Sequence, residues 1–427
     1  MALSTPAHLE SRISRPLELL LACVVVIMIG YGVTLTVLPY YAERIHGLAG
    51  SDQRLLALHV GLLTSVYALA QLVTSPFLGR IGDRVGRRPL LLLGLLGMGV
   101  TQVVFGLVTS LMALYALRIL GGIATASVLV SATAYVADST SDQDRSRGMA
   151  WFGTAVSLGL VAGPLLGGLL SRPGMAVRVG GVVIDGYSLP FFVAGLLALG
   201  IFLVAWRALP ESLHPRRVRS PHAVEDGFLV VPRLGILLSF VTAAQFGLAL
   251  FEGSFVLYSQ SRLGLDSGRA SLAFFVCGSV MAVLQALVVV PLSRVVAPLA
   301  QVALGFTVMG AGMIALAATR DFPLVLVSIG VLALGTALVT PNLSALVSLR
   351  SLHKTGTALG LKSSASSLGQ FMGPLTGAVL LGWRPESPFL LGGALLGGLG
   401  IAIASIFQMR KPHRDTSSSV PVAQDKR

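Results

Sequence analysis

The sequence predicts an all-α integral membrane protein, with twelve transmembrane helices arranged as two pseudo-symmetric six-helix halves. Hydrophobic residues make up 54% of the 427 residues and charged residues only 11%, whereas soluble domains carry about 25% charged residues. Apolar stretches of about 20 residues, the length that crosses a bilayer, recur along the chain. A fold of this length could not hide so much apolar surface from water, so the bilayer must be its solvent.

The apolar stretches fall into two sets of six. The predicted spans are 17–38, 58–79, 90–109, 112–137, 149–171, 188–209, 233–259, 269–291, 297–318, 322–349, 355–381 and 387–410. A segment rich in proline and arginine separates the sixth span from the seventh. We therefore expect four regions: an N-terminal six-helix bundle (1–209), a cytoplasmic linker (210–232), a C-terminal six-helix bundle (233–410) and a cytoplasmic tail (411–427).

The distribution of Lys and Arg indicates how the chain is oriented. The formal net charge is +13, which a nucleic-acid-binding protein could also carry. With a cytoplasmic N-terminus, 21 of the 31 Lys and Arg residues fall in cytoplasmic segments and eight in external loops. Such residues concentrate in the cytoplasmic loops of membrane proteins. We therefore expect a multi-pass protein of the cell (inner) membrane with both termini in the cytoplasm, and no nucleic-acid partner.

A short motif repeats between the two halves. The fifth span contains GPLLG at 163–167, and the eleventh contains GPLTG at 373–377. Internal repeats are typical of transporters, whose substrate site lies near the bilayer midplane between the halves. The two cysteines, Cys23 and Cys277, stand alone in apolar spans, so we expect both to be small core residues.

The loop predicted between the second and third spans reads GRIGDRVGRRP and begins at Gly79. Its glycines, including Gly79 and Gly86, permit a tight reversal of the chain. Asp83 can accept charge-assisted hydrogen bonds from Arg84 or Arg87. A cluster of this kind can hold one conformation and release it in another. The alternative is a loop that only orients the protein through its positive charge.

This run resembles motif A of the major facilitator superfamily, and the resemblance covers about residues 15–410. The sequence is similar to the twelve-span drug:proton antiporter branch, that is, to the tetracycline- and fluoroquinolone-type multidrug exporters. The resemblance implies the major facilitator fold, and a gating role for the glycines, aspartate and arginines just named. It also implies that an acid at the end of the fourth span partners these arginines. That role falls on Asp138, for which a plain helix-end charge is the alternative.

Two charged residues lie deep in predicted spans. Arg118 is about seven residues inside the outer end of the fourth span, and Glu252 about nine residues inside that of the seventh. Charges at such depth are costly and mark functional sites by default. Arg118 matches motif B, whose Arg the family implicates in proton coupling; an Arg packed on a carbonyl is the alternative. The stretch around Glu252 is similar to that of exporters in which a Glu serves proton coupling, although a structural or substrate-contacting acid remains open.

The fifth span carries Gly159, Gly163, Pro164 and Gly167. Proline removes a backbone hydrogen bond and glycine removes side-chain bulk, so this helix can kink and pack closely. The pattern resembles motif C, which accompanies antiporters rather than sugar-type symporters. This resemblance is the main reason to expect export. Close packing alone would explain the glycines without indicating a direction of transport.

Polar and aromatic residues within the spans predict an amphipathic substrate cavity. The first span offers hydroxyl groups where many drug exporters place Asp or Glu. The residues expected to line the cavity are Tyr31, Gln71, Gln245, Phe251, Phe255, Gln285, Asn342 and Gln370. Helix-to-helix hydrogen bonding is the alternative, and we expect about half of the polar residues to do only that.

These features together predict a proton-driven exporter of small amphipathic, drug-like molecules that works by alternating access as a monomer. An exporter of the cell's own metabolite or siderophore is the alternative. An integral membrane enzyme is less favoured, because the sequence contains no catalytic constellation. It has no HExxH or P-loop motif either, so we expect no metal, no cofactor and no use of ATP.

Overall fold

The computed structural model describes residues 15–45, 52–140, 145–171, 176–179, 182–212, 232–285, 287, 292, 295–349 and 355–409. The first half of the chain forms α1 (Arg15–Ala42), α2 (Gln53–Val85), α3 (Arg87–Phe105), α4 (Leu111–Ser139), α5 (Arg145–Leu170), β1 (Ala176–Val179), β2 (Val182–Asp185) and α6 (Leu189–Ala208). The second half forms α7 (Pro232–Leu263), α8 (Ser267–Leu284), α10 (Pro298–Ala318), α11 (Phe322–Leu349), α12 (Thr355–Leu381) and α13 (Ser387–Met409).

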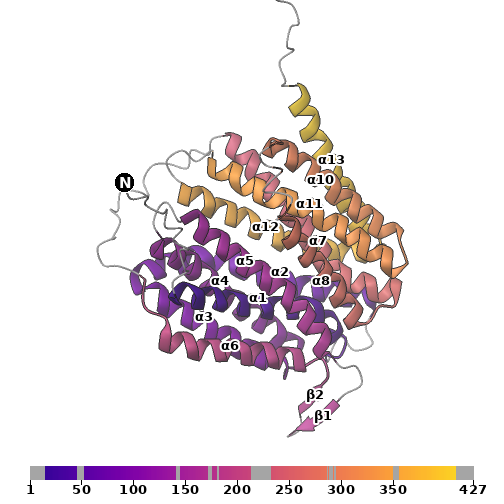
Figure 1. The fold of residues 1–427 in the computed structure, drawn as a ribbon. Helices are drawn as coiled ribbons and strands as arrows, with labels where there is room; N and C mark the ends of the chain where they lie inside the picture. The colour runs from indigo at the N-terminus through magenta and orange to yellow at the C-terminus, as the bar shows by residue number, and fades with distance from the viewer. Residues whose placement is uncertain are drawn as a thin grey trace, which may run out of the picture.

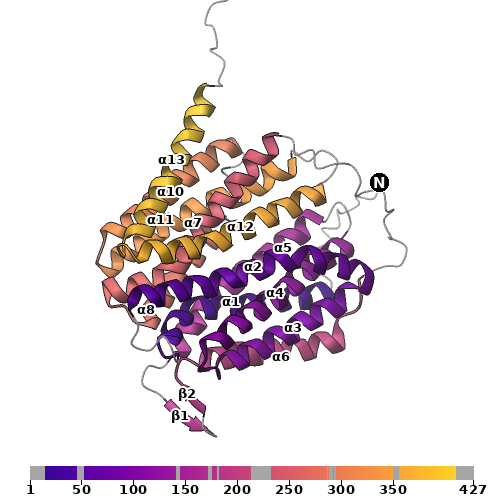
Figure 2. The ribbon, with the colours of Figure 1, turned by 180° about the vertical axis from the view of Figure 1, so that it is seen from behind.

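These twelve helices form two six-helix bundles, as Figures 1 and 2 show. In the N-terminal bundle α1 packs on α5 and α6, and α4 packs on α2 and α3. In the C-terminal bundle α7 packs on α12, and α10 packs on α11 and α13. Two seams join the bundles: α2 lies against α12, and α5 lies against α8.

Eleven of these helices are long and apolar enough to cross a membrane. The exception is α12, whose first half carries Lys362 together with several serines. The predicted span boundaries agree closely with the observed helices for most of the chain. Most of the predicted linker (213–231) and the predicted tail (411–427) lie outside the described residues, so these region boundaries stay predictions.

Two local features were not predicted from the sequence. The predicted second span ends at residue 79, but α2 continues to Val85, because its glycines stay helical and the chain reverses only at Gly86. The connection between α5 and α6 contains a hairpin in which β1 pairs antiparallel with β2, with Ala176 opposite Asp185. Four-residue strands in a loop carry too few residues to show an alternating pattern. We call the end of the molecule that bears this hairpin the hairpin end, and the opposite end, where α1 begins, the termini end (Figure 1).

Glycine stripes hold the helix pairs α1–α5 and α7–α12 together. A Cβ atom on Gly163 would come within 2.6 Å of the Ile29 carbonyl oxygen of α1. A Cβ atom on Gly373 would come within 2.7 Å of the Leu250 nitrogen of α7. The repeated motif therefore makes the same kind of close backbone contact in each bundle, as expected where small residues let helices approach in lipid.

The prolines of the repeat are packed equally tightly. A Cβ atom on Gly32 of α1 would lie 2.6 Å from Cδ of Pro164, and one on Gly253 of α7 would lie 2.8 Å from Cβ of Pro374. Both glycines therefore have no room for a side chain. Cys23 and Cys277 are 0% and 5% exposed, respectively, so both are core residues, as the sequence predicts.

The two seams are closed at the hairpin end. A Cβ atom on Gly61 of α2 would come within 2.7 Å of the Pro374 carbonyl oxygen of α12, and one on Gly168 of α5 would come within 2.5 Å of Cβ of Ser271 in α8. Beyond them, the Tyr40 hydroxyl donates to the Leu265 carbonyl at 3.2 Å. These contacts hold the two bundles together at the hairpin end.

Toward the termini end, the same seam helices become exposed. Along α2, Leu63 and Tyr67 are buried, whereas Phe77 is 56% exposed. Along α8, Phe274 is buried, whereas Val283 is 53% exposed. The contacts at Gly61, Gly168 and Tyr40 therefore place close packing between the bundles at the hairpin end.

Gly163→Ala should destabilise the protein, because the added methyl group meets the α1 backbone. Overpacking of this kind costs about 1–3 kcal/mol. The matched control is Gly153→Ala in the same helix, where nothing lies within 4 Å of the added atom, and where alanine should stabilise the helix by about 0.5–1 kcal/mol. Thermal unfolding in detergent measures both. Equal melting temperatures for the two variants would contradict the packing argument.

Closure of the hairpin end should depend on pH through Glu43, whose Oε1 accepts a hydrogen bond from Gln260 of the other bundle at 2.6 Å. Burial raises the pKa of Glu43, against smaller opposite effects of the Gln260 hydrogen bond and the Arg44 charge. Separation of the bundles would hydrate this carboxyl group and return its pKa toward the ordinary value. Closure therefore takes up protons, and it is favoured as the pH falls through the range just above the ordinary carboxyl pKa.

This pH dependence can be followed by the distance between spin labels at Arg54 and Trp383, which line one cavity between the bundles at the hairpin end. Acidification should increase the population with the short distance. Glu43→Gln should remove most of that response. A response of the same size in the variant would show that another group titrates.

Candidate functional site

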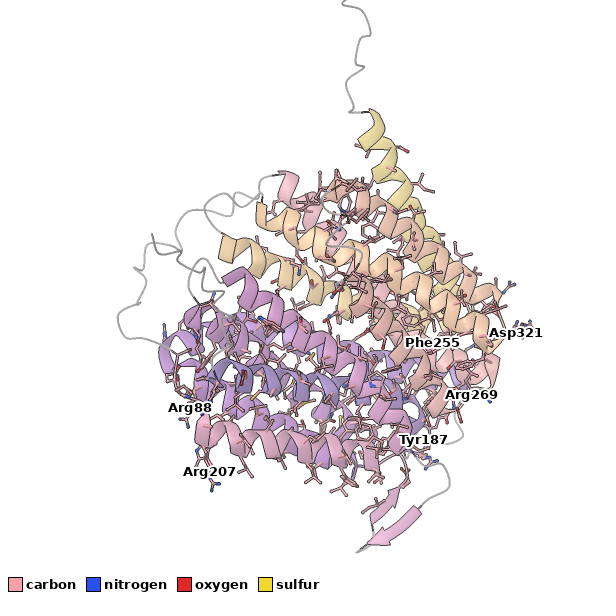
Figure 3. The ribbon with its side chains drawn as sticks, in the orientation of Figure 1. Arg88, Tyr187, Arg207, Phe255, Arg269 and Asp321 are labelled. Atoms are coloured by element: carbon pink, nitrogen blue, oxygen red, sulfur yellow. The ribbon has the colours of Figure 1, made fainter. Side chains whose placement is uncertain are left out.

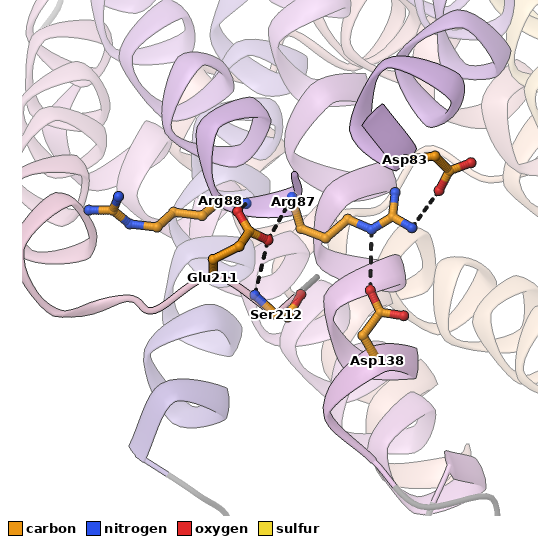
Figure 4. Close-up of polar contacts among 6 residues, drawn as sticks. All are labelled: Asp83, Arg87, Arg88, Asp138, Glu211 and Ser212. Atoms are coloured by element: carbon orange, nitrogen blue, oxygen red, sulfur yellow. Dashed lines mark hydrogen bonds and ion pairs between the residues drawn. The ribbon is translucent and has the colours of Figure 1, made fainter. Parts of the chain in front are cut away.

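The turn between α2 and α3 consists of a single residue, Gly86. Its φ of 110° lies in the region that favours glycine. A Cβ atom there would also collide with the carboxylate of Glu211, which follows α6. That carboxylate accepts hydrogen bonds from the backbone N–H groups of Arg87 at 2.9 Å and Arg88 at 3.1 Å (Figure 4). An anion at a helix N-terminus satisfies free N–H groups and the helix dipole, so Glu211 caps α3.

Arg87 joins two acids next to this turn, as Figure 4 shows. Its Nη2 donates to Asp83 Oδ1 at 2.5 Å and its Nε to Asp138 Oδ2 at 3.3 Å. The Arg87 side chain is 11% exposed, whereas that of Asp83 is 66% exposed. Asp83 therefore lies at the water-exposed rim of the cluster, and the buried guanidinium connects the ends of α2 and α4.

The motif A residues differ in what they contact. The structure brings Asp83, Arg87 and Asp138 together, and the gating role assigned to them stays a prediction. Arg84 is exposed, and Arg87 rather than Arg84 holds Asp83. A Cβ atom on Gly79 would meet only Val130, at 3.9 Å, so close packing does not explain this glycine. Glu211 was not predicted from the sequence, because a single acid at the start of a linker carries no distinguishing pattern.

Arg118 lies buried inside the N-terminal bundle and is 4% exposed. Its Nε donates to the Leu63 carbonyl at 3.0 Å, and its guanidinium carbon lies 4.4 Å from the ring centroid of Tyr67. A carbonyl acceptor and an aromatic face are both favourable partners for a guanidinium away from water. Throughout the described part of the chain, no ion pair joins Arg118 to Glu252.

Glu252 lies on α7 and faces the N-terminal bundle. Its Oε2 accepts a hydrogen bond from the Tyr31 hydroxyl of α1 at 3.5 Å. Both side chains are partly exposed, so neither is sealed in a bundle core. A cavity of about 10 Å³, the size of a single water, adjoins Tyr31, Tyr67 and Arg118. The carboxylate therefore sits at the boundary between the bundles, within reach of both.

The other residues predicted to line a substrate cavity fall into two groups. Phe251 and Phe255 are fully buried, and their rings pack on each other and on Phe274 with centroids 5.3–5.6 Å apart. Figure 3 shows Phe255 within the C-terminal bundle. Asn342 is 4% exposed and donates to Gln301 Oε1 at 3.0 Å. In this conformation the three side chains lie in contacts between helices, and their place in a substrate cavity stays a prediction.

The four glutamines of the predicted cavity, by contrast, are all partly exposed. They lie on α2, on α7, just beyond α8 and on α12: Gln71, Gln245, Gln285 and Gln370. Each of these elements takes part in a seam or in the α7–α12 pair next to it. Their contact with a substrate stays a prediction.

Charged side chains mark both ends of the molecule. Figure 3 shows Arg88 and Arg207 at the termini end, and Arg269 and Asp321 at the hairpin end. At the hairpin end Arg44 donates to Asp185 Oδ2 at 2.8 Å, and its guanidinium carbon lies 4.3 Å from the Tyr187 ring centroid. The long helices between these ends carry few charges, as expected of a chain that crosses a bilayer.

The two-bundle arrangement of apolar helices, with a motif A cluster at the termini end and a carboxylate between the bundles, defines a class of membrane transporters. The family model of the Major Facilitator Superfamily matches residues 20–316. The chain belongs to this superfamily. It is therefore a multi-pass membrane transporter with the major facilitator fold, and not an enzyme.

The chain is also similar to particular bacterial and human transport proteins. The chain is 30% identical to multidrug resistance protein 2 of Bacillus subtilis over 396 residues, which cover 90% of this chain and 94% of that protein. It is 30% identical to the class B tetracycline resistance protein of Escherichia coli over 361 residues, which cover 82% and 84% of the two chains. The crystal structure of the human organic anion transporter MFSD10 matches with a TM-score of 0.67 and 24% identity, covering 91% of this chain and 98% of that chain.

Glu211→Ala should loosen the start of α3, because two backbone N–H groups lose their acceptor. Loss of an N-terminal cap costs about 0.5–2 kcal/mol. Hydrogen exchange at the amides of Arg87 and Arg88 should therefore accelerate. Glu211→Gln, which keeps a neutral acceptor, should give a smaller effect. Unchanged exchange in Glu211→Ala would show that the cap is dispensable.

Proposed function

We propose that this protein exports small amphipathic molecules across the inner membrane in exchange for protons, by alternating access. The observation that carries the proposal is the placement of Glu252: a partly exposed carboxylate, in the middle of α7, in contact with the opposite bundle. A carboxyl group in this position can change its proton occupancy as its surroundings change. It can therefore link proton movement to movement of the bundles.

The arrangement of the seams supports alternating access. Contacts close the hairpin end through Gly61 and Gly168, whereas Phe77 and Val283 are exposed toward the termini end. With both termini in the cytoplasm, as we propose, the end closed by these contacts faces the outside, as expected of a state that loads cargo from the inside. An exporter must pass through such a state to load its cargo.

The nature of the cargo is inferred from the relatives and from the site. The similar bacterial proteins are named for multidrug and tetracycline resistance. An intramembrane carboxylate next to the rings of Tyr31 and Tyr67 suits cationic or zwitterionic amphiphiles, because it pairs with a positive charge while the rings contact apolar groups.

Cells that make the protein should accumulate less of a fluorescent cationic dye than cells without it. A protonophore should remove the difference, because it collapses the proton gradient that drives exchange. Equal dye accumulation in cells with and without the protein would contradict this substrate class. Efflux that survives the protonophore would contradict proton coupling.

Glu252→Gln should abolish substrate-induced proton movement in proteoliposomes, because glutamine keeps the shape of the side chain but carries no exchangeable carboxyl proton. The matched control is Glu18→Gln, which changes an acid in the first turn of α1 near the termini end. Undiminished antiport in Glu252→Gln would remove this residue from the coupling role.

Asp83→Asn should slow transport and leave substrate binding largely intact, because Asp83 lies at the rim of the motif A cluster, far along α2 from the carboxylate site. Initial efflux rates and equilibrium dye binding measure the two effects separately. Equal losses of binding and transport would indicate that the cluster is needed for folding rather than for gating.

A further inference from the structure

We propose that Tyr31 is a positioning residue for Glu252: its hydroxyl holds the ionised carboxylate against the N-terminal bundle and releases it on protonation. This inference rests on the proposed proton-coupled export. It assigns a partner to the carboxylate that the charge pattern of the sequence does not reveal. It also gives the hydroxyl of Tyr31, in the middle of α1, a defined task.

The contact between the two side chains joins the bundles. The Tyr31 hydroxyl donates to Glu252 Oε2 at 3.5 Å, across a sequence separation of 221 residues. This length is at the limit of a hydrogen bond, so a small relative movement of the bundles makes or breaks it. Both residues are partly exposed, so the contact is not sealed within either bundle.

Tyr31 itself is held from within its own bundle. Its ring stacks on that of Tyr67, with centroids 5.6 Å apart and planes inclined by 30°. The Tyr67 hydroxyl donates to Thr125 Oγ1 at 2.8 Å, and Arg118 lies over the Tyr67 ring. The position of the Tyr31 hydroxyl is therefore set by the N-terminal bundle alone.

The backbones beneath the two side chains are also fixed. The residue after Tyr31 is Gly32, which packs on Pro164 of α5. The residue after Glu252 is Gly253, which packs on Pro374 of α12. Because each helix is pressed against its own neighbour, the distance between the hydroxyl and the carboxylate reports how the two bundles sit relative to each other.

The charge of the carboxyl group determines the strength of this contact. An ionised carboxylate accepts a charge-assisted hydrogen bond, which is about twice as strong as a bond between neutral groups. The described titratable side chains around it are Tyr31 from α1 and Cys277 from α8, with Tyr67 of α2 and Arg118 of α4 behind Tyr31. Protonation of Glu252 therefore weakens its hydrogen bond with Tyr31, which joins the two bundles.

Tyr31→Phe tests this assignment, because it keeps the ring and its stacking and removes only the hydroxyl. The readout is the pH at which substrate-induced proton movement in proteoliposomes is half-maximal. Loss of a donor to the ionised form should move this midpoint upward by about half to one pH unit. The matched control is Tyr41→Phe in the same helix, whose hydroxyl donates to the Val108 carbonyl within the N-terminal bundle at 2.8 Å. That variant should keep the wild-type midpoint.

Glu252→Asp provides a second variant that does not alter α1. It withdraws the carboxylate from Tyr31 by one methylene group and should raise the midpoint in the same direction. The double variant Tyr31→Phe/Glu252→Asp should shift no further than the larger single shift, because both changes remove one contact. Independent, additive shifts would overturn the assignment.

The outcomes separate this inference from the proposed function. If Glu252→Gln abolishes proton movement while Tyr31→Phe keeps the wild-type midpoint, the carboxylate couples protons without Tyr31, and the inference is wrong. If Glu252→Gln leaves proton movement intact, the proposed coupling role of Glu252 is wrong, whatever the result for Tyr31→Phe. A raised midpoint in Tyr31→Phe with normal behaviour of Tyr41→Phe supports both.

Discussion

Close contact between glycine and the backbone of a neighbouring helix is the constraint on which the rest of this structure depends. In the N-terminal bundle Gly163 lies against α1, and in the C-terminal bundle Gly373 lies against α7. Lipid offers helices no hydrophobic reason to associate, so such contacts carry much of the packing energy. They hold the helices of each bundle closely together. The two bundles meet mainly at the α2–α12 and α5–α8 seams.

Pro374 takes part both in the packing within its own bundle and in the packing between the two bundles. Within its bundle its ring contacts Gly253, the residue next to Glu252; across the seam its carbonyl oxygen contacts Gly61 of α2. One residue of the repeat therefore supports both the helix that carries the carboxylate and the closure of the hairpin end. The two charged residues deep in the spans also differ: Arg118 donates to a carbonyl inside its own bundle, whereas Glu252 accepts a hydrogen bond from the other bundle.

The helices could be predicted from the sequence because apolar length is a direct consequence of bilayer thickness. The contact between Asp83 and Arg87 in motif A could also be predicted, because the two residues are one helical turn apart in the sequence. The contact between Tyr31 and Glu252 could not be predicted from the sequence, because 221 residues separate the two and only the packed bundles bring them together. The packing of Phe251 and Phe255 on Phe274 could not be predicted, since a helix that is apolar all round does not show in its sequence which face is buried.

The burial of both native cysteines has a practical consequence. Neither the thiol of Cys23 nor that of Cys277 is open to water in this conformation. A water-soluble maleimide added to the unaltered chain would find little to modify, because alkylation requires an accessible thiolate. A single cysteine introduced at an exposed position, such as Trp383 at the hairpin end, would therefore provide almost the whole labelling signal. The unaltered protein should therefore give a low background signal when introduced cysteines are labelled to find which positions lie on each side of the membrane.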